Sequence, residues 1–260
     1  MGDVTALLAG YDEQMRPAEV ANLPAGVRTE RDGPIVRVVG QKRGFISAPA
    51  DLALGGDALD ALIARQRDFF AARGEAVEWK TRAHDRPADL TDRLRAAGFL
   101  PEPRETVLIG LVDTLSGQRV PLPPDVSIRP TAAPDDMRRI AAMESEIWQE
   151  DWSSLADDLI GRVENGTMVV FVAEAGGEVV STAWLVFKPG TEFAGLWGGS
   201  TLAEWRGKGI YRALVARRAD LAAERGVRYL QVDASDDSRP ILQRLGFVAV
   251  TTTTPYVWTP

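Results

Sequence analysis

The segment that most constrains this chain is a glycine-containing turn at residues 205–211, Trp-Arg-Gly-Lys-Gly-Ile-Tyr, between an apolar strand and an amphipathic helix. Apolar residues and glycines fill residues 195–202, which predicts a buried strand whose backbone is open to a ligand. Apolar residues then recur at helical spacing up to Arg225-Gly226, which predicts a helix from residue 210. Because the turn glycines let the first helical amides converge, and the helix dipole favours an anion there, the turn is predicted to bind a phosphate.

Two common phosphate motifs fit this turn poorly. A P-loop needs Ser or Thr after its Gly-Lys pair, but Lys208 is followed by Gly209. A dinucleotide fingerprint needs a third glycine, and Arg212 stands at that position. A dinucleotide-dependent oxidoreductase is therefore the weakest of the functional alternatives.

From about Leu196 to Phe247 the chain resembles the GNAT family of acyl-CoA N-acyltransferases. The signature Arg/Gln-x-x-Gly-x-Gly/Ala is met by Arg206, Gly209 and, imperfectly, Tyr211. The family's later features follow in order: a helix, a strand at 228–233, a short helix at 240–245, a Gly-Phe corner and a closing strand at 248–258. The resemblance implies an α/β fold with a mixed sheet flanked by helices, and acetyl-CoA as cofactor without a metal.

In that family the turn amides wrap the coenzyme A pyrophosphate, and the preceding strand holds the pantetheine arm and the thioester carbonyl. Ser235 stands where the family often has Asn. The resemblance therefore implies these cofactor-binding residues: Gly199, Ser200, Thr201, Arg206, Gly207, Lys208, Gly209, Ile210, Tyr211, Arg212 and Ser235.

The proton-transfer groups are less well defined by the sequence. Leu242 stands where the family commonly has a Tyr that protonates the departing thiolate, so a non-catalytic acyl-CoA sensor remains an alternative to an enzyme. Asp233 and Glu192 are the candidate bases, with a turn cap and a solvated strand-end charge as their structural alternatives. The terminal carboxylate of Pro260 is a further candidate, and His84 is expected to be solvated in a loop.

A repeated order of predicted elements indicates two domains in tandem. A helix ending at Arg73-Gly74, a strand at 76–80 and a Gly98-Phe99 corner match the later helix, strand and corner. We therefore expect a degenerate GNAT-like domain at 1–120, a linker at 121–125 and the acetyltransferase domain at 126–260. In the first domain Asp57 is expected to cap the helix at the anion position, so this domain should bind no coenzyme A.

The amino-acid composition limits the kinds of partner that the protein is expected to bind. The 260 residues include no Cys and one His, which excludes disulfides and thiolate or His-rich metal sites. A formal net charge of −7 argues against nucleic acid as the main partner and favours cationic amines. Together with the GNAT resemblance, it implies a small-molecule primary amine as acceptor. The sequence has no apolar run long enough to predict a membrane segment, so a cytoplasmic location is expected. The protein is expected to be a monomer or a homodimer. The acceptor is expected near residues 146–155, where Trp148 and Trp152 face a ligand or the core; Trp184 and Trp197 are candidates for its walls.

Overall fold

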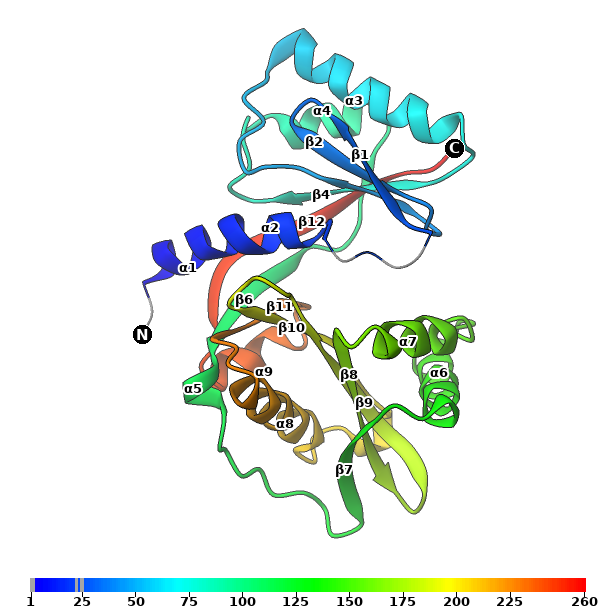
Figure 1. The fold of residues 1–260 in the computed structure, drawn as a ribbon, viewed down its shortest axis with the longest axis vertical. Helices are drawn as coiled ribbons and strands as arrows, with labels where there is room; N and C mark the ends of the chain where they lie inside the picture. Colours follow the sequence, from blue (N-terminus) through cyan, green and yellow to red (C-terminus); the bar gives the residue numbers. More distant parts are fainter. Residues whose placement is uncertain (1–2, 22, 24–25) are drawn as a thin grey trace. The chain divides into compact units, whose positions relative to one another are not determined.

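The computed structural model describes residues 3–21, 23 and 26–260. The chain divides into two compact units (Figure 1). Unit 1 comprises Met1–Leu108, Asp233–Pro240 and Val248–Pro260, and unit 2 comprises Ile109–Val232 and Ile241–Phe247. The fold is mixed α/β, as expected, and none of the helices described is long and apolar enough to cross a membrane.

Unit 1 is a sheet with helices around it. Its sheet runs in the order β1, β2, β3, β4, β12, with antiparallel pairs except for the parallel pair β3 and β4, and short β5 also pairs with β12. The elements are α1 (Val4–Gly10), the π-helical turn η1 (Tyr11–Met15), α2 (Arg16–Ala18), β1 (Arg28–Asp32), β2 (Ile35–Val39), β3 (Gly44–Ser47), α3 (Gly56–Ala71), β4 (Val77–Arg82), α4 (Leu90–Ala96), β5 (Leu100–Pro101), β6 (Glu105–Leu111, which continues into unit 2) and β12 (Val248–Trp258).

The last strand of the chain completes the sheet of unit 1. In β12, Tyr256 lies opposite Trp79 of β4, and both side chains are buried in one apolar core. That core also holds Leu59, Leu62 and other residues that α3 presents at helical spacing. From its position in the sequence, this strand was expected to belong to the second domain, but it pairs with β4 and belongs to unit 1. The limits of the two domains remain a prediction.

The expected helix at 59–70 is confirmed as α3, but the expected cap is wrong. Gly55 is the N-cap, without a side-chain hydrogen bond, and Asp57 is an exposed residue of the first turn. At that position its carboxylate interacts favourably with the helix dipole but caps no amide.

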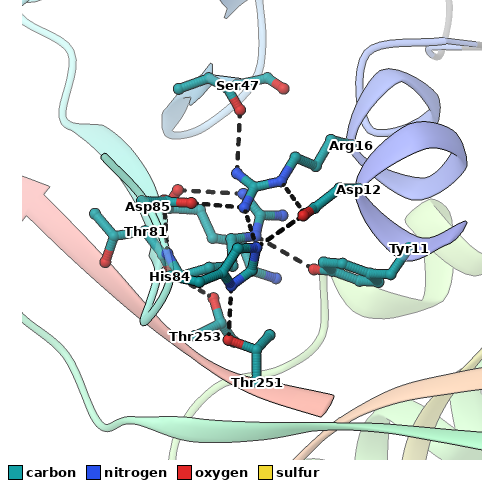
Figure 2. A network of polar contacts seen from close by, with 12 residues as sticks. Tyr11, Asp12, Arg16, Ser47, Thr81, His84, Asp85, Thr251 and Thr253 are labelled. Carbon is teal, nitrogen blue, oxygen red and sulfur yellow. Dashed lines mark hydrogen bonds and ion pairs between the residues drawn. The ribbon is translucent and has the colours of Figure 1, made fainter. Parts of the chain in front are cut away.

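Arg16 bridges the segments that follow the parallel strands β3 and β4 and lies in a network of polar contacts (Figure 2). Its guanidinium donates to the Ala48 carbonyl (3.3 Å) after β3 and to the Asp85 carboxylate (2.6 Å) after β4. Further along the chain, the two segments are joined by a backbone hydrogen bond, in which the Arg86 amide donates to the Ala50 carbonyl at 2.7 Å. The segments that follow these two strands are therefore joined by the Arg16 side chain and by a backbone hydrogen bond.

Unit 2 repeats the succession of antiparallel strands ending in a parallel pair. Its strands follow the order β7, β8, β9, β10, β11, and only β10 and β11 are parallel. The elements are α5 (Val112–Leu115), β7 (Val126–Thr131), α6 (Pro134–Trp148), α7 (Leu155–Glu164), β8 (Met168–Ala175), β9 (Glu178–Phe187), β10 (Phe193–Thr201), the 3-10 turn η2 (Ala203–Trp205), α8 (Ile210–Glu224), β11 (Tyr229–Ala234, entering unit 1 at Asp233) and α9 (Arg239–Arg244, which begins in unit 1).

Helices cover both faces of this second sheet (Figure 1). Val170 and Val172 of β8 pack with α6 and α7 on one face, whereas Phe171 and Ala173 pack with α8 on the other. This alternation is what a strand buried on both faces requires. The strand at 195–202 and the helix from residue 210, expected from sequence, are confirmed as β10 and α8.

Candidate active site

Strand β10 carries a bulge. Its antiparallel register with β9 shifts between Trp197 and Ser200. Gly198 lies in this break with φ 58°, and a Cβ atom there would be 2.0 Å from the Trp184 ring. Only glycine fits this position, because a side chain would be both strained and in collision. Since a bulge takes backbone groups out of the ladder, this part of β10 can offer them to a ligand.

The edge of β10 that pairs with β11 is unpaired beyond the start of the strand. The parallel pairing with β11 runs from Phe193 to Gly195 and ends there, while β10 continues to Thr201. In unit 1, by contrast, the corresponding parallel pair is followed by Arg16 and by the backbone bond from Arg86 to Ala50. Unit 2 therefore has an unpaired strand edge where unit 1 has a closed one.

The turn after β10 presents positive charge around uncapped amides. Gly209 is the N-cap of α8 in the left-handed conformation (φ 84°), and no side chain caps this helix end. Arg206, Lys208 and Arg212 are exposed around it. Arg206 donates to the Thr201 carbonyl at 3.0 Å, which ties the turn to the end of β10. The first amides of α8, the helix dipole and these cations together suit an anion.

Tyr211 packs against the strand rather than over the turn. A Cβ atom on Gly199 would be 2.7 Å from its ring, so the missing side chain of Gly199 makes room for the phenol. Burial raises the pKa of Tyr211, and the charge of Arg218 partly opposes this. The aromatic replacement of the usual small residue is thus accommodated by a glycine on β10.

Arg218 lies under the bulge. It is 1% exposed, and it donates from Nη1 to the carbonyls of Trp184 and Trp197, each at 3.3 Å, and from Nε to Leu214 at 3.1 Å. Its Nη2 has no partner among the described residues, and burial lowers its pKa to about 10. A buried cation without a carboxylate is costly, so its main-chain bonds at the bulge are what hold it.

Glu144 lies on α6 and reaches the same strand. It is 3% exposed, and its Oε2 accepts hydrogen bonds from Ser200 Oγ and from the indole of Trp148, each at 2.9 Å. Its Oε1 is buried without a partner among the described residues. Burial raises the pKa of Glu144, and the two hydrogen bonds oppose the rise.

The two candidate bases from the sequence both form ion pairs. Asp233 is in unit 1, where its carboxylate is 2.5 Å from the ammonium of Lys80, and both side chains are largely buried. Glu192 precedes β10 and forms an exposed ion pair with Arg228 at 3.1 Å. Their catalytic roles remain predictions.

Other residues from the sequence are also placed. Ser235 lies in unit 1, exposed, with its hydroxyl 3.3 Å from that of Ser238, whereas the other predicted cofactor residues lie in unit 2. The side chain of Leu242 is fully buried. His84 is only partly exposed, because its ring contacts Asp12 and Thr251 in the network around Arg16 (Figure 2). The described residues contain no group of three or more His, Asp or Glu that could hold a metal ion.

Comparison with known families gives the identity of this region. The model of the acetyltransferase (GNAT) family matches residues 135–247, which include the bulged strand, the glycine turn and α8. Residues 135–247 form a GNAT-family acetyltransferase domain. No curated protein sequence matches the chain.

Solved structures of similar fold extend over the whole chain. A GCN5-related N-acetyltransferase from Kribbella flavida is 17% identical, with a TM-score of 0.69, over 100% of this chain and 96% of that one. A tandem GNAT protein from the clavulanic acid biosynthesis pathway is 16% identical, with a TM-score of 0.65, over 93% and 86%. A GCN5-related N-acetyltransferase from Sphaerobacter thermophilus is 15% identical, with a TM-score of 0.63, over 98% and 91%. At these identities the likeness establishes the fold, and the GNAT domain is thus part of a chain whose full length has this architecture.

Sequence reasoning missed Arg218 and Glu144, although each left a signal. Arg218 falls four residues after Leu214 on the buried face of α8, and Glu144 falls four residues after Ile140 on the buried face of α6. A charged residue at helical spacing within an apolar stripe is unusual, because its desolvation must be offset. This pattern could have identified both residues as candidates for the site.

Proposed function

We propose that unit 2 transfers an acetyl group from acetyl-CoA to the primary amine of a small molecule. The observation that carries this proposal is the uncapped start of α8, with Gly209 at its N-cap and exposed cations beside it, directly after a bulged strand. A pyrophosphate suits this turn because backbone amides, helix dipole and guanidinium groups all favour an anion.

The residues present fit coenzyme A. The proposed pyrophosphate loop is residues 207–212, and the unpaired edge of β10 from 199 to 201 is proposed to hold the pantetheine arm. Bound acetyl-CoA would supply an acetyl group activated as a thioester. Arg206 already contacts the end of β10, so the loop and the strand are held as one surface.

The chain's own residues must then handle a proton. An alkylammonium with a pKa near 10.4 costs roughly 4–5 kcal/mol to deprotonate at pH 7. Asp233 and Glu192 remain the candidates proposed from sequence, although both are ion-paired. The fully buried Leu242 provides no acid, but a thiol with a pKa of about 8.5 can leave largely unaided.

We also propose that the first domain binds no coenzyme A. In unit 1, Arg16 and the hydrogen bond from Arg86 to Ala50 bridge the segments that follow the parallel strands, whereas in unit 2 the edge of β10 beyond its parallel pairing is unpaired. We further propose a degenerate GNAT-like domain at 1–120, a linker at 121–125 and the acetyltransferase domain at 126–260, whose last strand β12 pairs with β4 in unit 1. The protein is proposed to be cytoplasmic, as a monomer or a homodimer.

Calorimetric titration with acetyl-CoA tests the proposal. Wild type should bind one equivalent, and the double variant R206A/K208A should bind at least tenfold more weakly, because each charge-assisted hydrogen bond contributes about 1.5–3 kcal/mol. Gly209→Asp should abolish binding, whereas Gly226→Asp, at the other end of α8 and also at positive φ, should not. A Cβ atom would lie 3.3 Å from the Pro121 carbonyl at Gly209 but in open space at Gly226, so a thermal melt of each variant must accompany the titration. Unchanged affinity in both site variants would refute the cofactor site, two equivalents would refute the role of the first domain, and binding without acetylation of any amine would favour the sensor.

A further inference from the structure

A buried carboxylate and two exposed indoles lie together where α6 meets β10. Glu144 sits in the last two turns of α6, Trp148 ends that helix, and Trp152 follows in the loop. The Trp148 and Trp152 side chains are 57% and 38% exposed, which is unusual for such large apolar groups. The Trp152 amide donates to the Ser145 hydroxyl at 2.9 Å, so this loop is fastened to α6 beside Glu144.

Glu144 links this surface to the cofactor strand. Its Oε2 accepts a hydrogen bond from Ser200, which directly follows the two glycines of the β10 bulge. Its other bond comes from the exposed indole of Trp148. One carboxylate therefore touches both the strand expected to hold the thioester and the aromatic surface.

The carboxylate lacks the cation that its burial calls for. The only described partners of Glu144 are neutral, and Oε1 has none. An ionised carboxylate placed in apolar surroundings is costly unless a cation and further hydrogen bonds accompany it. An ammonium group provides both, with three N–H donors.

We propose that Glu144, Trp148 and Trp152 form the acceptor site, which takes a primary alkylammonium with an apolar body, and that Glu144 receives its proton. The inference rests on the proposed function and specifies its substrate class. The ammonium replaces the indole as donor to Oε2 and gives Oε1 its missing partner. The indoles contact the apolar body and stabilise the cation through their ring faces.

The chemical step balances. The alkylammonium gives one proton to the Glu144 carboxylate, and the free amine nitrogen forms a bond to the thioester carbonyl carbon. The carbon–sulfur bond breaks, and the leaving sulfur takes the second proton from nitrogen, so that amide, thiol and protonated Glu144 result. Burial raises the pKa of Glu144, which makes it a better base than an exposed carboxylate.

The test compares Glu144→Gln with Glu164→Gln, the same change at an exposed position at the end of α7. Gln keeps an acceptor for Ser200 and Trp148 but loses the charge. Phenethylamine, hexylamine and cyclohexylmethylamine serve as probes, each paired with its neutral alcohol, in calorimetric binding and in acetylation assays. We expect wild type and Glu164→Gln to prefer amine over alcohol at least tenfold, and Glu144→Gln to lose this preference and at least 100-fold in kcat/KM, with acetyl-CoA affinity within threefold of wild type.

The outcomes separate this inference from the proposed function. If acetyl-CoA binds and amines are acetylated equally well by Glu144→Gln, the acceptor assignment is wrong while the function stands. If wild type binds acetyl-CoA but prefers no amine in the panel over its alcohol, the acceptor assignment is also wrong. If acetyl-CoA itself does not bind, the proposed function fails. Trp148→Phe is a second variant, and it should retain or improve amine affinity because it removes the competing indole donor but keeps a ring.

Discussion

The guanidinium of Arg218 donates a hydrogen bond to the main-chain carbonyl of Trp197, at 3.3 Å, from a position that is 1% exposed. Trp197 is the last paired residue before the break in β10, so this bond fixes one side of the bulge. Burial lowers the pKa of Arg218 to about 10, yet the group remains charged at neutral pH. A charged donor beneath the bulge thus orients the strand that we propose holds the thioester.

Arg218→Met should separate catalysis from stability. The apolar side chain fills a similar volume and removes an uncompensated charge, so we expect the free energy of unfolding to change by less than about 1 kcal/mol. Without the donor, the carbonyls of Trp184 and Trp197 lose their anchor, and kcat should fall at least tenfold while acetyl-CoA affinity changes less than threefold. Steady-state kinetics and calorimetry measure this. Arg217→Met, at an exposed neighbouring position, should behave as wild type, and equal kcat for both variants would contradict the role of Arg218.

Gly198→Ala should damage the bulge. The new Cβ would be 2.0 Å from the Trp184 ring, at a φ of 58° that disfavours any side chain. Overpacking and left-handed strain together should cost at least about 2 kcal/mol and lower the acetylation rate. Gly190→Ala, at φ 80° in open space, should cost only about 1 kcal/mol and leave the rate unchanged. Denaturant unfolding and rate assays compare the two, and equal effects would show that the space beside Trp184 is not limiting.

The stability of the protein should decrease as pH rises from mildly acidic to mildly alkaline, because of Glu105. Burial, and then the charge of Asp233, raises the pKa of Glu105 to about 7 from the usual 4.5. The folded state therefore binds this proton more tightly than the unfolded state. Its contribution to stability is complete below about pH 4.5 and is lost as pH rises through 7. Glu105→Gln should flatten the melting temperature between pH 5 and 8, as followed by circular dichroism, whereas the exposed Glu13→Gln should not; an unchanged slope would exclude Glu105 as its source.

Tyr256→Ala should destabilise unit 1. The ring is 3% exposed and packs in the core that contains Trp79, so its loss should cost about 3–5 kcal/mol, as for other large aromatic truncations. Thr259→Ala, just beyond β12 and exposed, is the control. A loss below 1 kcal/mol in chemical denaturation would mean that β12 contributes little to this core.

The sequence by itself determined the local parts of the GNAT domain. The strand before residue 202, the glycine turn and the helix from residue 210 were predicted because each depends on neighbours within a few residues: apolar periodicity, left-handed glycines and helix stop signals. The same holds for α3, which was also predicted from sequence. Its predicted cap at Asp57 was wrong, because the helix begins two residues earlier, at Gly55, and the sequence alone does not fix the residue at which the backbone becomes helical.

Only the tertiary structure decided which polar side chains contact one another. Asp233 and Lys80 are 153 residues apart in the sequence, and Glu144 and Ser200 are 56 apart, so no spacing rule connects either pair. The pairing of β12 with β4 is equally distant, because strand partners are selected by packing rather than by chain order. Arg218 could be assigned to the buried face of a helix, but its partners are main-chain carbonyls exposed by a bulge. The energies of such buried groups depend on the atoms folded around them, and only the folded chain specifies those atoms.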